Sequence, residues 1–342
     1  MNNTYFPVGK LPPSFLQQLI NNLASDDDTV ILGPGTGLDC AVIDLGATYL
    51  VVKSDPITFT QEDIGWYLVH VNANDIATTG AVPRWLMVTL LLPEKSTDKL
   101  LVEEITEQLK IVCDEIGVVI IGGHTEITFG LDRPILAGTM LATVSKKHLI
   151  TPKGIQIGDE LILTKGVPIE ATAILSRKFE SELGQILKPS EIKIAQSFLT
   201  DPGVSVLEDA QIALKAGRVT GMHDPTEGGL ASALWEMAYA GNCSLFFDPN
   251  TVPIPEISVR ICQALDVDPL AAISSGALLI STPAEDSSQI IEELTEAGIE
   301  SACIGSFEDG EPAVWMNKDN ERTLLPKPKR DEVARLLDKH IV

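Results

Sequence analysis

Two patterns of apolar residues alternate along the first part of the chain. Short apolar runs bounded by glycine, proline and polar residues predict buried strands near residues 29–32, 40–44, 49–55, 85–93, 118–123 and 135–144. Apolar residues spaced three or four apart predict helices over 14–23, 62–79 and 96–116. The polar segment HTEITFGLDR is expected to form a loop between two strands. Together these elements predict an α+β domain over residues 1–145.

The same alternation continues in the second part. A turn-rich connection, KKHLITPKGIQIGD, leads into the predicted strand ELILTKG. Helices are expected near 169–183, 189–199, 203–216, 256–265, 286–297 and 331–340. The segment VTGMHDPTEGGL predicts a strand and a glycine-containing loop directly before the helix ASALWEMAYAG, and SLFFDP, GALLIST and SACIGSF predict further strands. This pattern predicts a second α+β domain over residues 146–342.

Composition agrees with two globular domains and narrows the possible partners. With 342 residues and 44% hydrophobic content, the chain can bury a sizeable core. The formal net charge of −23 would repel nucleic acid backbones and anionic lipid, and no lysine or arginine cluster offsets it. No apolar run approaches the roughly 20 residues that span a bilayer. We therefore expect neither a nucleic acid partner nor a membrane partner.

The cysteines and the first residues predict a cytoplasmic protein. Five scattered cysteines, Cys40, Cys113, Cys243, Cys262 and Cys303, show no spacing typical of zinc or of a disulfide framework. The segment MNNTYFPVGKLPPSF lacks a cationic region followed by an apolar stretch, so it does not resemble a signal peptide.

Polar side chains that could carry chemistry lie where strands and helices of the first domain meet loops. These candidates are Asp39, Asp55, Asn72, Asp75 and His124. Asn72 and Asp75 share one face of a predicted helix. Carboxylates at strand ends can converge, and Mg²⁺ prefers carboxylate and phosphate oxygens, so a metal–triphosphate site is one interpretation. Turn residues, a packed or solvated helix face and a structural histidine are the alternatives.

Two glycine-containing loops could bind phosphate. LGPGTGLD exposes backbone N–H groups, but it lacks the Walker lysine and the dinucleotide fingerprint, and a plain turn explains it as well. In HDPTEGGL, Asp224 and Thr226 could cap the following helix, while Gly228 and Gly229 could let an anion approach its positive N-terminus. An ordinary capped helix is the alternative there. His223 could act as a proton shuttle.

Five segments, in this order, resemble the aminoimidazole ribonucleotide (AIR) synthetase superfamily: GLDCAVI, VVKSDPIT, DIGWYLVHVNANDIATTGAVPRWLMVTLLLP, GVVIIGGHTEIT and MHDPTEGGLASALWEMA. The match runs through nearly the whole chain. That superfamily includes purine-pathway cyclo-ligases, thiamine-monophosphate kinase, selenophosphate synthetase and HypE. The second-domain segment looks most like the HypE branch, which serves hydrogenase maturation.

The resemblance implies a fold, a cofactor and a reaction. Its N-terminal domain is expected to form a β-barrel across a homodimer, with the C-terminal domain packed against it. ATP with Mg²⁺ is expected to phosphorylate an amide-type oxygen of an acceptor, which becomes a leaving group. The implied catalytic residues are Asp75, Asp224 and His124, the implied metal ligands are Asp39, Asp55 and Asp75, and the implied nucleotide contacts are Asp39, Asn72, Thr226, Gly228 and Gly229.

The chain departs from the superfamily pattern at three places. Leu38-Asp39 stands where many relatives have paired acidic residues, and His124 stands where many have aspartate after Gly-Gly. HypE proteins carry the reacting group on a cysteine at the extreme C-terminus, whereas this sequence ends DKHIV. The resulting hypothesis is a HypE-like paralogue that activates a small-molecule or protein-borne acceptor.

Three rival functions share the fold. A purine cyclo-ligase would need a basic pocket, for which Arg84, Lys165 and Arg177 are the candidates. A thiamine-monophosphate kinase is comparable, because GLDCAVI resembles that branch too. The third rival is a non-catalytic nucleotide-binding scaffold dimer.

Overall fold

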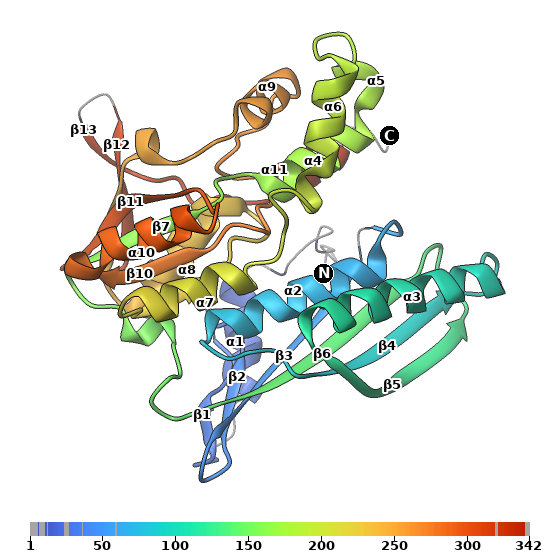
Figure 1. Ribbon diagram of the computed structural model, residues 1–342, viewed down its shortest axis with the longest axis horizontal. Coiled ribbons are helices and arrows are strands. Elements are labelled where there is room, and N and C mark those ends of the chain that lie inside the picture. The colour runs from blue at the N-terminus through green and yellow to red at the C-terminus, as the bar shows by residue number, and fades with distance from the viewer. Residues whose placement is uncertain are drawn as a thin grey trace, which may run out of the picture.

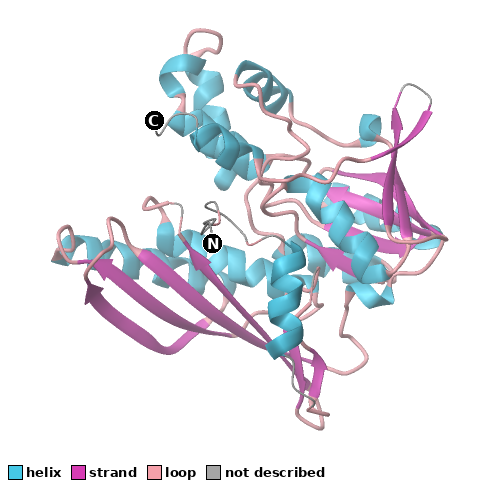
Figure 2. Cartoon of the chain, turned by 180° about the vertical axis from the view of Figure 1, so that it is seen from behind, coloured by secondary structure: helices cyan, strands magenta, loops and turns pink. Residues whose placement is uncertain are grey.

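The structure, a computed structural model, describes residues 6, 11, 13–23, 27–35, 37–58, 60–318 and 321–338. Two mixed β-sheets, each covered by helices, make up the molecule (Figures 1 and 2). The first has the strand order β1-β2-β3-β6-β4-β5 and the second the order β13-β12-β9-β11-β7-β10-β8. This is the two-domain α+β architecture that the apolar pattern predicts.

The first sheet and its helices come from the N-terminal part. Its elements are α1 (Pro13–Leu23), β1 (Val30–Leu32), β2 (Ala41–Asp44), β3 (Tyr49–Ile57), α2 (Ile64–Thr78), β4 (Trp85–Pro93), α3 (Lys99–Ile116), β5 (Val119–Thr128) and β6 (Ile135–Val144). Burial alternates along β6, so one face of the sheet packs against α2 and α3 (Figure 1). The nine-residue pairing of β3 with β6 holds the centre of this sheet.

The second sheet follows after residue 158. Its strands are β7 (Asp159–Thr164), β8 (Gly221–His223), β9 (Ser244–Phe247), β10 (Leu279–Pro283), β11 (Ser301–Glu308), β12 (Ala313–Lys318) and β13 (Glu321–Leu324). Its α-helices are α4 (Ile169–Lys178), α5 (Glu180–Leu183), α6 (Pro189–Gln196), α7 (Leu207–Ala216), α8 (Gly229–Gly241), α9 (Glu256–Ala264), α10 (Ala284–Glu296) and α11 (Glu332–Asp338). Strands β7 and β10 are almost entirely buried because helices cover both faces.

Helix α2 joins the two halves. It packs on the first sheet and also against α7 of the second domain (Figure 1). The side chain of Asn74 donates to the carbonyl oxygen of Val204 at 2.7 Å and accepts from the backbone N–H of Val206 at 3.0 Å. Thirteen of the 15 residues of α2 are buried, which explains why small residues and buried amides fill a helix with little amphipathic character.

Several predicted boundaries are wrong. The expected loop HTEITFGLDR begins inside a strand, because β5 pairs in parallel with β4 as far as Thr128. The helix expected from residue 203 begins at Leu207, since Gly203 is left-handed with φ 90° and Val204 and Val206 are bound to Asn74. The hairpin of β12 and β13 was not predicted. The last helix was expected to reach residue 340. Helix α11 is described as far as Asp338, and residues 339 and 340 lie outside the described residues.

The first sheet of the single chain is open, with β1 and β5 at its edges. No closed barrel is present among the described strands, and the barrel across a homodimer stays a prediction. None of the described helices has both the length and the apolar character that crossing a membrane requires.

Candidate active site

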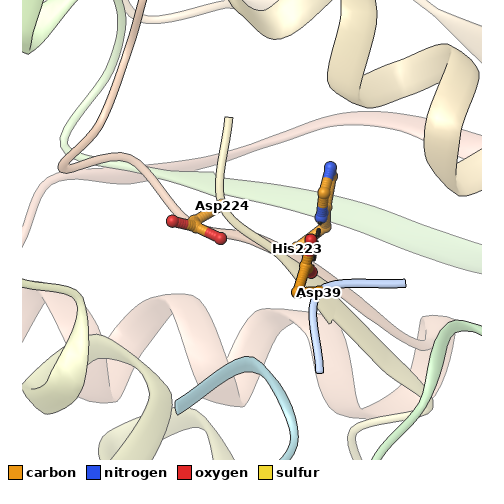
Figure 3. A group of neighbouring side chains, drawn as sticks. All are labelled: Asp39, His223 and Asp224. Atoms are coloured by element: carbon orange, nitrogen blue, oxygen red, sulfur yellow. Dashed lines mark hydrogen bonds and ion pairs between the residues drawn. The ribbon is translucent and has the colours of Figure 1, made fainter. Parts of the chain in front are cut away.

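Carboxylates from both domains converge at the domain boundary. Asp39 lies in the loop before β2, and Asp224 directly follows β8. Ligand atoms of Asp39, His223 and Asp224 all lie within 4.8 Å of one another, with His223 facing Asp39 and Asp224 beside the pair (Figure 3). Asp75 on α2 and Asp55 on β3 complete the acidic group through their charge interactions with these residues. The family resemblance implied Asp39, Asp55 and Asp75 as metal ligands and Asp224 as part of a separate loop, and their roles stay predictions.

His223 is clamped between two carboxylates. Its Nδ1 lies 2.8 Å from Oδ2 of Asp39, and its Nε2 lies 2.8 Å from Oε2 of Glu236 on α8. Burial opposes protonation, but Asp39 and Glu236 outweigh it and raise the pKa of His223 well above its ordinary value. A protonated imidazole donates from both nitrogens, so His223 holds Asp39 in place as an internal cation.

Lys53 on β3 is a second internal cation, which is not among the candidates predicted from the sequence. Its Nζ lies 3.2 Å from Oδ2 of Asp55 and 3.1 Å from Oδ2 of Asp75. Burial opposes the charge, but Asp75 and Asp55 raise the pKa of Lys53 above its ordinary value, so the amine is an ammonium. The position of Lys53 two residues before Asp55 puts both side chains on one face of the strand, which was the available signal.

Two buried carboxylate oxygens in this cluster lack hydrogen-bond donors within the described part of the chain: Oδ2 of Asp75 and Oδ1 of Asp224. Lys53 faces Asp75 as an ion pair without the alignment of a hydrogen bond. Burial, followed by the charge of Asp224, raises the pKa of Asp75 well above its ordinary value. Burial, followed by the charge of Asp39, raises the pKa of Asp224 to about 7. Unsatisfied oxygens among like charges are the donor set that a Mg²⁺ ion fits.

Asn72 positions Asp55. Its Oδ1 accepts from the backbone N–H of Asp55 at 3.0 Å, and its Nδ2 donates to the carbonyl oxygens of Asp55 and Leu68 at 3.3 and 2.9 Å. The side chain is fully buried between α2 and β3. This hydrogen bonding fixes the strand that carries Lys53 and Asp55; direct contact of Asn72 with a nucleotide stays a prediction.

The loop from Asp224 to Gly229 is built differently from the sequence expectation. The residue preceding α8 is Gly228, and neither the side chain of Asp224 nor that of Thr226 makes a recorded capping hydrogen bond to that helix in the described structure; Thr226 accepts from the N–H of Gly229 with its backbone carbonyl oxygen. Instead, the N–H of Gly228 donates to Oδ2 of Asp331 at 2.8 Å. A Cβ on Gly229 would lie 2.4 Å from the carbonyl oxygen of Ala272, so protein packing requires that glycine. Anion binding by Thr226, Gly228 and Gly229 stays a prediction.

His124 lies apart from the metal-capable group formed by Asp39, His223 and Asp224. It is exposed on β5, with Nε2 3.3 Å from Oε2 of Glu126. It lines an open hollow between β4, β5 and α3. Its catalytic role stays a prediction.

The first glycine loop packs against the second domain. Gly37 has φ 72°, and a Cβ there would lie 2.8 Å from the carbonyl oxygen of Glu236. Thr36 of the same loop lies outside the described residues. Close packing on α8 therefore accounts for Gly37, and the loop brings Asp39 to His223.

Comparisons with known proteins agree on one family. The family models for the AIR synthase related protein match residues 37–144 with the N-terminal domain and residues 156–316 with the C-terminal domain. A hydrogenase expression/formation protein of Methanocaldococcus jannaschii is 28% identical over 94% of this chain and 96% of its own length. The carbamoyl dehydratase HypE of Cupriavidus necator is 28% identical over 76% of this chain and 72% of its own length.

A solved structure of the hydrogenase maturation protein HypE in complex with ATP is similar in fold. It superposes with a TM-score of 0.69 and 22% identity, covering 91% of this chain and 90% of that one. At this identity, the likeness supports the two-domain fold.

Proposed function

Because the chain belongs to the AIR synthase related family, we propose that it is an ATP- and Mg²⁺-dependent enzyme of the HypE-like branch that phosphorylates an amide-type oxygen of an acceptor. The observation that carries this proposal is the buried oxygen Oδ1 of Asp224, which lacks a hydrogen-bond donor within the described part of the chain. It lies next to Asp39 at the boundary of two domains, where a phosphate–metal complex would satisfy it. ATP is the phosphate compound named for the HypE structure to which this fold is similar.

The residues of the cluster have separable roles in this proposal. Asp39 and Asp224 would hold the metal, Asp75 holds Lys53 beside it, and His223 keeps Asp39 oriented toward Asp224. Bound Mg²⁺ would neutralise charge on the phosphates. The acceptor oxygen attacks the terminal phosphorus of ATP, the bond to ADP breaks, and the new phosphate ester makes that oxygen a leaving group.

We propose that the acceptor is a separate small molecule or a group on a partner protein. Four of the five cysteines are buried and Cys303 is half-buried. Burial raises the pKa of each of these thiols, most strongly at Cys40, which donates to the carbonyl oxygen of Asp75. Protonated, buried thiols are poor carriers of a reacting group.

The purine cyclo-ligase alternative is weaker because two of its three basic candidates already form ion pairs. Lys165 is buried, pairs with Asp209 at 2.9 Å and donates to the carbonyl oxygen of Ser205. Arg177 lies 3.3 Å from Asp63. These contacts disfavour a ribose phosphate pocket built on the two residues.

Nucleotide binding tests the proposal directly. Isothermal titration with a non-hydrolysable ATP analogue should show binding that depends on Mg²⁺ in the wild type. Asp224→Ala should weaken it at least roughly tenfold, because it removes an unsatisfied ligand oxygen. Asp114→Ala, which removes an exposed aspartate of α3 paired with Lys110, is the matched control and should bind as the wild type does. Wild-type protein that binds no analogue, or equal binding by a folded Asp224→Ala variant, would refute the assigned site.

A further inference from the structure

We propose that Lys53 takes the place of one divalent cation in the acidic cluster, so that each chain binds a single metal ion on the side of Asp224. The idea rests on the proposed function and specifies how its site is built. It assigns Asp55 and Asp75 a resident positive charge where the sequence suggested two metal ligands.

Geometry supports this assignment first. The ammonium of Lys53 lies between the carboxylates of β3 and α2, within 3.2 Å of Asp55 and 3.1 Å of Asp75. Its side chain is 16% exposed, that of Asp75 is 5% exposed and that of Asp55 is 39% exposed. The pair of Lys53 and Asp75 is therefore shielded from water, while Asp55 opens toward the solvent.

The fixed backbone keeps Lys53 in this position. Asn72 bonds both the N–H and the carbonyl oxygen of Asp55, which fixes β3 against α2 only two residues from Lys53. Asp75 belongs to the same helix as Asn72, one turn further along. The lysine therefore has little freedom to leave its two carboxylates.

Charge then limits what else can bind there. A divalent ion coordinated by Oδ2 of Asp75 would lie within a few ångströms of the ammonium, in a place where burial weakens screening. Oδ1 of Asp224 lacks a hydrogen-bond donor among the described residues, and Lys53 forms its ion pairs with Asp55 and Asp75. The ligand atoms of Asp39, His223 and Asp224 lie within 4.8 Å of one another. One metal therefore fits on the Asp224 side and a second is repelled by Lys53.

An ammonium also contributes what a metal cannot. It has three N–H donors, so that it can donate to a phosphate oxygen while its charge pairs with Asp55 and Asp75. We expect Lys53 to contact the anionic end of the nucleotide.

Counting bound Mn²⁺ by electron paramagnetic resonance tests this inference without relying on turnover. The probe is Mn²⁺ alone, then Mn²⁺ with the non-hydrolysable ATP analogue. Wild-type protein should bind one Mn²⁺ per chain under both conditions. Lys53→Met, which keeps the length of the side chain but removes its charge, should gain a second Mn²⁺ site with at least roughly tenfold tighter binding than any second site of the wild type.

Lys146→Met is the matched control, since it removes a lysine paired with Asp44 at the first sheet, outside the cluster. It should keep one Mn²⁺ per chain. Two Mn²⁺ ions on the wild type, or a Lys53→Met variant with an unchanged count and affinity, would overturn the inference. If Lys53→Met fails to fold, Lys53→Arg gives the second test, because its retained charge should keep the count at one. Failure to bind the analogue while the Mn²⁺ count behaves as expected would refute the proposed function alone.

Discussion

Glu170, at the start of α4, is a buried carboxyl whose Oε2 has no hydrogen-bond donor among the described residues. Burial raises the pKa of Glu170 to about 7 from 4.5, although hydrogen bonds from Ser275 oppose the shift. A raised folded-state pKa adds stability below the unfolded-state pKa, and this stability is lost as the pH rises through the folded-state pKa. Glu170 therefore makes the folded protein less stable at pH 8 than at pH 5.

Glu170→Gln should remove that pH dependence. Between pH 5 and 8, the free energy of unfolding of the wild type should fall by about 2.5 kcal/mol relative to the variant. Urea denaturation at several pH values measures this difference. Glu182→Gln, at an exposed position of α5, is the control and should follow the wild type. Parallel curves for wild type and Glu170→Gln would show that Glu170 titrates normally.

Single residues show where sequence reasoning succeeds and where it stops. Asp39, Asp55 and Asp75 became candidates because carboxylates at strand ends and on one helix face can be read from spacing, and Asp224 because it precedes a helix. The contacts of His223 with Asp39 and of Gly228 with Asp331 were not identified, since they join residues 184 and 103 positions apart. Packing of the two domains brings the first pair together, and packing within the second domain brings the second pair together. Lys53 was visible as a lysine near Asp55, but not as a charge fixed between two carboxylates.

At the scale of elements, the parallel pairing of β4 and β5 depends on one glycine. Gly123 has φ 149°, and a Cβ there would lie 1.8 Å from the carbonyl oxygen of Val88. Gly122 has φ 156° but meets nothing within 4 Å. The two neighbours share a backbone conformation and differ in the space around them.

Gly123→Ala should therefore destabilise the protein by at least roughly 2 kcal/mol more than Gly122→Ala. The extra methyl group must push β5 away from β4, whereas Gly122→Ala carries only the conformational penalty. Urea denaturation followed by circular dichroism would measure both variants. Equal destabilisation of Gly123→Ala and Gly122→Ala would mean that β5 can move away from β4 without a cost in the free energy of unfolding.

Most elements could be predicted because apolar spacing follows burial within one element. The errors occur where a distant partner decides the outcome. The apolar run at 118–123 predicted the first half of β5, but residues 124–127 are mostly polar and exposed, and only their hydrogen bonds to β4 define them as strand. The start of α7 is set by Asn74 of the first domain.

At the scale of the whole molecule, the exposed edge at β5 supports the proposed homodimer. Val119, Ile121 and Ile127 are 59%, 53% and 60% exposed on this strand, and Phe129 just beyond it is 82% exposed. An exposed, apolar edge strand is a surface that proteins usually cover.

Ile121→Asp should convert the proposed dimer to a monomer, because it places a charge in the middle of the edge that would be buried. Light scattering after size-exclusion chromatography measures the mass. Ile186→Asp is the control, since Ile186 is 54% exposed in the second domain. A wild-type mass of one chain would refute the homodimer, and a dimeric Ile121→Asp variant would exclude β5 as its interface.

The two-domain organisation was predictable, because the alternation of apolar patterns restarts near the middle of the chain. The arrangement of the domains was not, since it depends on buried amides such as Asn74 that a sequence cannot distinguish from surface residues.

The burial of α2 on nearly every side has a consequence for how the chain acquires its structure. Neither half can complete its own interior alone: the first sheet leaves the far side of α2 uncovered, and the second domain lacks the helix that receives residues 204–206. We therefore expect the two halves to fold together, with the N-terminal domain of a nascent chain completed only after α7 has emerged from the ribosome.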